Sequence, residues 1–251
     1  MRMSVCILAI GLAAAAISSG AKAAEIKVLT AGAFKQVLLA LLPDFEKQSG
    51  HTVRLENNTV GALSKRIEGG ETFDLAVLTP GAIDKLAGKF VPGSRVNLAR
   101  VGIGVVVKEG TPKPDISSVE AFKKALLTAK SIAYIDPAAG GSSGIYVSGL
   151  LDRLGIAAEL KGKSKLIAGG AVAEHIAKGE AELGIHQISE ILPVKGITLV
   201  GPLPADIQSY TTYAGAIGAN ARAGEAAKEL LRTLTSPAAA SVLRAKGMEP
   251  G

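Results

Sequence analysis

The chain has 251 residues, of which 48% are hydrophobic and 20% charged, and its formal net charge is +6. Its basic residues are spread along the sequence, and its aromatic residues are five phenylalanines, four tyrosines and no tryptophan. Because the sequence offers neither a basic stripe nor an aromatic stacking platform, we expect no nucleic acid among its partners. The mild positive charge favours an anionic ligand, although only weakly.

The first 23 residues have the features of a cleavable signal peptide. Arg2 supplies a positive start, residues 5–17 form an apolar stretch, and residues 21–23 fit a small-x-small cleavage site. The apolar stretch is shorter than the roughly 20 residues that a membrane-spanning helix needs, which disfavours the alternative of a retained N-terminal anchor. We therefore expect an exported, periplasmic protein whose mature chain begins at Ala24 or Glu25.

The single cysteine lies inside this predicted leader. Cys6 is not preceded by the kind of sequence that directs lipid attachment, and cleavage leaves a mature chain without cysteine. Neither a disulfide nor a thiolate site is then expected. The residues that remain are enough for one large domain or for two modest lobes, each with its own core.

The first half of the mature chain alternates strands and helices. The sequence predicts strands at 26–30, 53–56 and 73–78, and helical spacing of apolar residues predicts helices at 34–45, 61–67 and 83–86. Gly50 is a plausible helix stop. This order predicts a parallel sheet with right-handed crossovers.

A longer apolar strand at 101–107 is expected either to be buried on both faces or to cross between lobes. A second series follows it, with strands at 131–135, 165–168, 183–186, 197–200 and 212–217 and helices at 143–154, 172–178, 226–234 and 238–246. Two similar α/β halves predict two lobes that face a cleft. We assign residues 24–104 and 218–251 to one lobe and residues 105–217 to the other.

A ligand site is expected where helices begin after strands. In open α/β sheets, ligands bind beyond the carboxyl ends of the strands, and helix N-termini present free N–H groups and a positive dipole end. Residues 31–33, 59–61, 142–144 and 169–171 have this form. The small residues of 140–144 would let a ligand approach the backbone closely. We therefore predict capture of one small anion by closure of the lobes.

Several segments of the chain resemble a known family. They are residues 28–33, 61–70, 73–77, 136–137, 143–146, 181–185 and 235–240. Together they resemble the periplasmic solute-binding proteins of ABC importers, with the two-lobed type II fold, and within that group the molybdate-binding branch. The resemblance covers essentially all of the mature chain. It implies mixed, mostly parallel sheets flanked by helices, a ligand cleft between the lobes, a monomer, and an inner-membrane ABC permease as partner.

The resemblance also implies which residues meet the ligand. They are Gly32, Ala33, Thr59, Val60, Gly61, Ser142, Ser143, Gly169, His186 and Gln187. The family has serines where this chain has Ala33 and Val60, and its cleft tyrosine corresponds to Gln187. Three hydroxyl donors are therefore absent, and sites built on hydrogen bonds discriminate strongly when a donor is missing. Molybdate or tungstate is the family default, whereas another oxyanion, a small organic carboxylate or a role as a sensor domain are the alternatives.

One motif in the sequence also raises the alternative of catalysis. Residues 140–144 match the G-x-S-x-G pattern of serine hydrolases, with His175 or His186 as the only plausible bases. This short pattern arises easily in a Gly/Ser-rich turn, so we expect no chemistry and no cofactor. The histidine spacing does not predict a metal site. His186 lies at the exit of an apolar strand, either as a structural residue or in the cleft, where it would make anion affinity pH-dependent.

Overall fold

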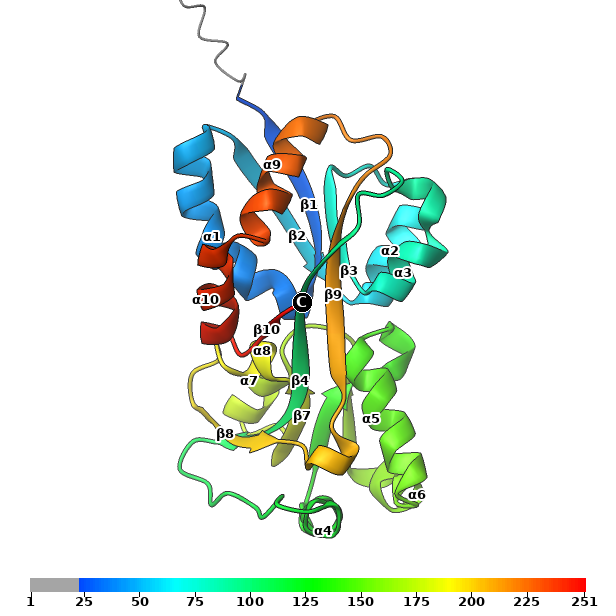
Figure 1. The fold of residues 1–251 in the computed structure, drawn as a ribbon. Helices are drawn as coiled ribbons and strands as arrows, with labels where there is room; N and C mark the ends of the chain where they lie inside the picture. The colour runs from blue at the N-terminus through cyan, green and yellow to red at the C-terminus, as the bar shows by residue number, and fades with distance from the viewer. Residues whose placement is uncertain (1–22) are drawn as a thin grey trace, which may run out of the picture.

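The computed structural model describes residues 23–251, so the predicted signal peptide and Cys6 lie outside the described residues, apart from residue 23. The chain forms two α/β lobes, one above the other in Figure 1, joined by two long strands. Within residues 23–251, no helix combines the length and the apolar character that a membrane crossing needs.

Lobe 1 is built mainly from the first and last parts of the described chain. Its strands and helices are β1 (Glu25–Ala31), α1 (Gly32–Ser49), β2 (Thr52–Asn58), α2 (Val60–Glu68), β3 (Leu75–Leu78), α3 (Pro80–Lys85), α9 (Gly224–Leu234), α10 (Pro237–Ala245) and β10 (Glu249–Pro250). β1 pairs in parallel with β2 and β3, as the alternation of strands and helices predicts. α1 ends at Gly50, whose φ of 73° gives a left-handed cap.

Lobe 2 contains the middle of the chain. Its elements are α4 (Val119–Thr128), β5 (Ile132–Ile135), α5 (Ser142–Arg153), α6 (Ala157–Leu160), β6 (Ser164–Ile167), α7 (Val172–Ala177), β7 (Leu183–Gln187), α8 (Ile188–Ile191) and β8 (Ile197–Pro202). β5 pairs in parallel with β6 and β7. The sequence reading missed α4, α6 and α8, of which α8 is a four-residue helix directly after β7.

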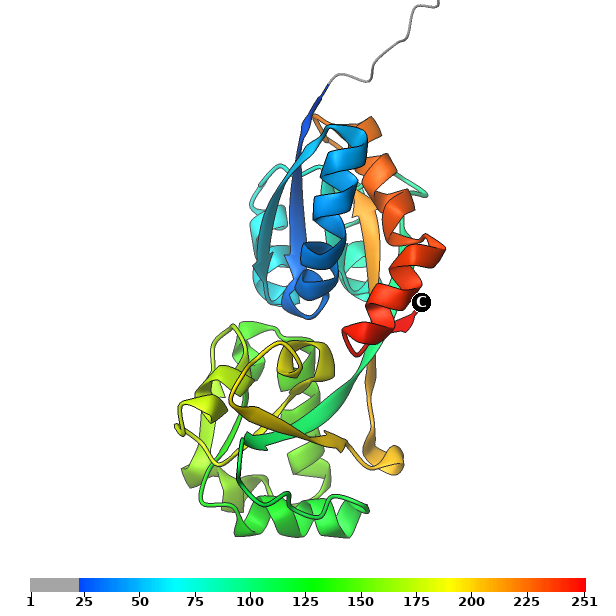
Figure 2. The ribbon, with the colours of Figure 1, turned by 90° about the vertical axis from the view of Figure 1, so that its left-hand side faces the viewer.

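Two strands run between the lobes, β4 (Val96–Lys108) and β9 (Tyr210–Ile217) (Figures 1 and 2). Residues 96–102 of β4 pair antiparallel with β9, whereas residues 103–108 pair with β7 and β8. Both expectations for the apolar strand at 101–107 are confirmed, because its residues are all buried and the strand crosses between the lobes. The lobe boundaries at 104/105 and 217/218 stay a prediction, because both strands pass through the junction.

Helices cover both faces of each sheet, which places a hydrophobic core on either side. In lobe 1, one core lies under α1, α9 and α10 and the other under α2 and α3. In lobe 2, the cores lie under α4, α5 and α6 and under α7 and α8. Because each lobe has its own pair of cores, the turns at the strand ends are free to form a site between the lobes.

Candidate functional site

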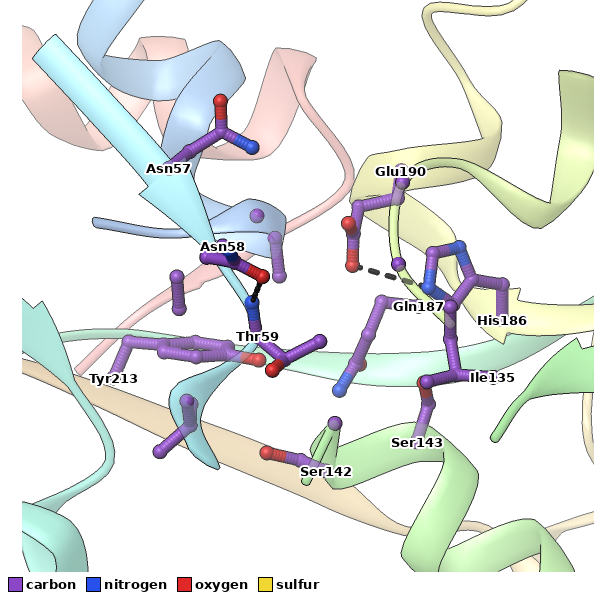
Figure 3. Close-up of a pocket in the computed structure, with 17 residues that line it drawn as sticks. Asn57, Asn58, Thr59, Ile135, Ser142, Ser143, His186, Gln187, Glu190 and Tyr213 are labelled. Carbon is purple, nitrogen blue, oxygen red and sulfur yellow. Dashed lines mark hydrogen bonds and ion pairs between the residues drawn. The ribbon is translucent and has the colours of Figure 1, made fainter. Parts of the chain in front are cut away.

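A cavity of about 320 Å³ lies between the two lobes, at the carboxyl ends of the parallel strands (Figure 3). The residues that line it are Ala31, Gly32, Ala33, Asn57, Asn58, Thr59, Val60, Ile135, Gly141, Ser142, Ser143, Gly169, Gly170, His186, Gln187, Glu190 and Tyr213. Among these described lining residues none is lysine or arginine. Among the lining groups, attraction for an anion therefore comes from backbone N–H groups, hydroxyls and amides.

Two long helices begin at this cavity from opposite lobes. α1 starts at Gly32 after the N-cap Ala31, and α5 starts at Ser142 after the N-cap Gly141. In the described structure neither N-terminus is capped by a side chain, so their first N–H groups stay available to a ligand. Since each helix also directs its positive dipole end into the cavity, the pair forms a two-sided anion site.

The N-terminus of α2 has a different role, because two of its donors bind the other lobe. The Gly61 N–H donates to the Gly140 carbonyl at 3.0 Å, and the Thr59 hydroxyl donates to the Ala139 carbonyl at 2.5 Å. The same hydroxyl accepts from the Ala62 N–H. Thr59 therefore has no proton left for a ligand and does not replace the missing hydroxyl donors.

The glycine-rich run at 140–144 is explained largely by packing. A methyl group on Gly61 would lie 2.7 Å from the Cα of Gly140, so the two backbones touch where the lobes meet. A methyl group on Gly144 would collide with the carbonyl oxygen of Ile135, on the strand beneath α5. Packing is therefore a sufficient reason for these glycines, and close approach of a ligand to this run stays a prediction.

A buried carboxyl and a buried imidazole lie side by side in the cavity (Figure 3). Nε2 of His186 is 3.4 Å from Oε2 of Glu190, and their side chains are only 2% and 17% exposed. Nδ1 of His186 has no hydrogen-bond partner among the described residues. Glu190 reaches across to lobe 1, where a methyl group on Gly32 would lie 2.5 Å from its Oε1.

Burial keeps both groups uncharged near neutral pH. It raises the pKa of Glu190 to about 8, with a small opposing effect from Lys35, and it lowers the pKa of His186 to about 3. The pair is therefore a neutral acid beside a neutral base and not an ion pair. Burial and the nearby Glu190 also raise the pKa of the Tyr213 hydroxyl above its usual range.

Gln187 and Tyr213 add two further polar side chains to the cavity lining. The Gln187 side chain is 1% exposed, and its Nε2 donates to the Thr211 hydroxyl at 3.0 Å. Its Oε1 has no partner within the described structure. Tyr213, on β9, brings a phenol into the cleft near Ser142 and Gln187. The cleft thus has a tyrosine, although not at the position that the sequence comparison indicated.

The structure gathers nine of the ten predicted site residues around the cavity, and the tenth, Gly61, lies at the contact between the lobes. Their contact with a ligand stays a prediction. Asn57, Asn58, Glu190 and Tyr213 were not predicted from the sequence. Asn57 and Asn58 stand at the end of β2, which was the one available signal, whereas Glu190 lies in the short α8 and Tyr213 within β9. His175 pairs instead with Glu180 on the exposed surface of lobe 2, away from the serines. His186 contacts Glu190, so the structure does not support the serine hydrolase hypothesis.

Two α/β lobes, a crossing pair of strands and a ligand-sized cavity between them define the periplasmic binding protein fold of type II. The molybdate-binding protein of Azotobacter vinelandii has this fold and superposes with a TM-score of 0.70, at 23% identity over 89% of this chain and 98% of that one. The family model for bacterial extracellular solute-binding proteins matches residues 26–249. The chain belongs to this family.

Two proteins that are similar to this chain in sequence have names that describe different functions. The chain is 29% identical to the molybdate-binding protein ModA of Azotobacter vinelandii over 98% of both proteins. It is 35% identical to an aconitate isomerase from a Pseudomonas species over 90% of this chain and 87% of that protein. The firm expectation of a protein without chemistry is therefore wrong, because a relative that covers nearly the whole chain is named as an enzyme.

Proposed function

We propose that this protein binds a small unsaturated polycarboxylate of the aconitate type between its lobes and isomerises it. The observation that carries the proposal is the pair of uncapped helix N-termini that face each other across the cavity. One carboxylate of the ligand binds at α1 and a second at α5. A helix N-terminus favours a carboxylate by about 0.3–1 kcal/mol through its dipole, and each charge-assisted hydrogen bond adds about 1.5–3 kcal/mol.

The rest of the cavity supports a polycarboxylate over a tetrahedral oxyanion. A volume of about 320 Å³ exceeds what a handful of atoms fills, whereas a tricarboxylate has more than twice the atoms of molybdate. Ala33 and Val60 offer no hydroxyl to an oxyanion, and the hydroxyl of Thr59 is already used. The 35% identity with a protein named aconitate isomerase supports the same ligand class.

The chemistry requires no cofactor or co-reactant. Aconitate has a double bond flanked by a methylene group. When a proton leaves the methylene carbon, the double bond moves, and a proton returns to the carbon that was vinylic. One C–H bond breaks and one forms, and the new double bond takes either geometry. The cis and trans isomers interconvert in this way without rotation about a double bond.

The relationship to ModA supports a second role, delivery of the bound solute to an ABC permease. It implies an exported chain that works in the periplasm and binds one ligand as a monomer. Two measurements separate the two functions. The purified protein is mixed with trans-aconitate and followed by NMR, and calorimetry measures the binding of tricarballylate, the saturated analogue, and of molybdate. We expect cis-aconitate to appear and tricarballylate to bind more tightly than molybdate. Micromolar binding of molybdate without conversion of aconitate would favour oxyanion transport.

A further inference from the structure

We propose that Glu190 is the catalytic residue that removes the proton from the methylene carbon of the bound polycarboxylate. This inference rests on the proposed function and assigns its central step to one side chain. Glu190 stands on lobe 2, at the third position of α8, and its carboxyl reaches the first turn of α1 in lobe 1. It therefore lies beside the point where we place one carboxylate of the ligand.

This position suits removal of a proton next to a carboxylate. As the proton leaves, negative charge spreads from the carbon into the neighbouring carboxylate, which the N-terminus of α1 stabilises where it develops. The double bond then shifts, and the protonated Glu190 has a proton to return to the other carbon. Atoms and charges balance, because the proton moves from carbon to Glu190 and back to carbon.

The groups around Glu190 keep its carboxyl basic and oriented. His186 from β7 lies 3.4 Å from Oε2, Lys35 acts on it from α1, and Tyr213 faces it from β9. Because burial outweighs the effect of Lys35, the pKa of Glu190 is about 8. General bases are most efficient when their pKa lies near the working pH. At neutral pH the carboxyl is mostly protonated, so an incoming polyanion meets little repulsion.

No other acidic side chain fills this place. Among the described residues that line the cavity, Glu190 is the sole carboxylic acid. Placing an acid in an anion-binding cleft lowers the affinity for an anion whenever the acid ionises, and a protein that only binds gains nothing from it. The burial of Glu190 beside His186 is therefore better explained by proton transfer than by binding.

The test compares Glu190→Gln, which keeps the shape of the side chain, with Glu190→Asp, which keeps a shorter carboxyl. General acid–base catalysis contributes about 10²–10⁴-fold. We expect Glu190→Gln to lower kcat by at least about 100-fold and to bind tricarballylate as tightly as the wild type. Glu190→Asp is expected to recover part of the turnover. In the wild type, kcat is expected to rise between pH 6 and 8.

A steric variant tests the same carboxyl without removing it. The methyl group of Gly32→Ala displaces the Glu190 carboxyl, and we expect kcat to fall at least about tenfold. Gly81→Ala is the matched control, because Gly81 also lies in the first turn of a helix, α3, with open space around it. Turnover within tenfold of the wild type in Glu190→Gln would overturn the assignment. Absence of turnover in the wild type would overturn the proposed function itself, so the two failures differ.

Discussion

The contact between Gly61 and Gly140 predicts that one added methyl group weakens ligand capture. In Gly61→Ala the new Cβ would lie 2.7 Å from the Cα of Gly140. Carbon atoms pack best at about 3.5–4.0 Å, so the lobes must separate by about 1 Å at this point. The neighbouring atoms are backbone and have no rotamer with which to move aside.

The expected loss of binding free energy follows from the two hydrogen bonds that join the lobes at this point. The Gly61–Gly140 bond of 3.0 Å and the Thr59–Ala139 bond of 2.5 Å both lengthen. At about 0.5–1.5 kcal/mol for each bond, the closed form loses about 1–3 kcal/mol. Because about 1.4 kcal/mol corresponds to tenfold in affinity, binding is expected to weaken by about 5- to 150-fold.

The substitution should weaken the contact between the lobes and not the helix that carries it. Alanine is better than glycine within a helix by up to about 1 kcal/mol, so α2 itself is not weakened. Calorimetric titration with tricarballylate gives the affinity, and thermal unfolding without ligand gives the stability. In Gly81→Ala the same preference of a helix for alanine applies, but the new methyl group would have no neighbour within 4 Å. This control should therefore bind tricarballylate like the wild type. Affinity within twofold of the wild type in Gly61→Ala would refute the reasoning.

Three further outcomes follow from the described contacts. Gly144→Ala is expected to destabilise the fold by about 1–3 kcal/mol, seen as a lower denaturation midpoint, because its methyl group collides with the Ile135 carbonyl; an unchanged midpoint would contradict this. Arg66 hydrogen-bonds to Glu71 and lowers its pKa from 4.5 to about 2, so this carboxylate stabilises the fold above pH 4.5 and loses its effect as pH falls toward 2. In urea titrations, Glu71→Gln should accordingly have a lower free energy of unfolding than the wild type at pH 7 and an equal one near pH 2. A difference that persists near pH 2 would count against the ion pair. Burial raises the pKa of Glu190 from 4.5 to about 8, so the wild type should lose stability between these pH values, whereas Glu190→Gln should not; parallel curves would show that the carboxyl is not buried.

The sequence was sufficient to predict most of the fold, because each signal is local. Apolar runs mark β1, β3 and β5, and Gly50 ends α1 with the left-handed conformation that glycine favours. α4 was missed although Ser118 caps it and apolar residues recur four apart along it. The four-residue α8 has no periodicity to detect, since it is shorter than the pattern that would reveal it.

The site was predictable where its residues stand at strand ends or helix starts, as His186, Gln187 and Ser142 do. Helix starts after strands are local, so the turns at Gly32 and Ser142 were identified. Glu190 was missed because its burial depends on Gly32, which approaches from the other lobe. Tyr213 was missed for a related reason, since β9 enters the cleft only through its pairing with β3 and β4. Contacts between distant segments decide which side chains face the cavity, and no local pattern records them.

A crystal structure of the complex with tricarballylate tests the central claim most directly. We predict the ligand between the lobes, with one carboxylate at the N–H groups of Gly32 and Ala33, a second at those of Ser142 and Ser143, and a methylene carbon within reach of Glu190. Tricarballylate bound outside the cavity, or inside it with neither helix N-terminus contacted, would contradict the account.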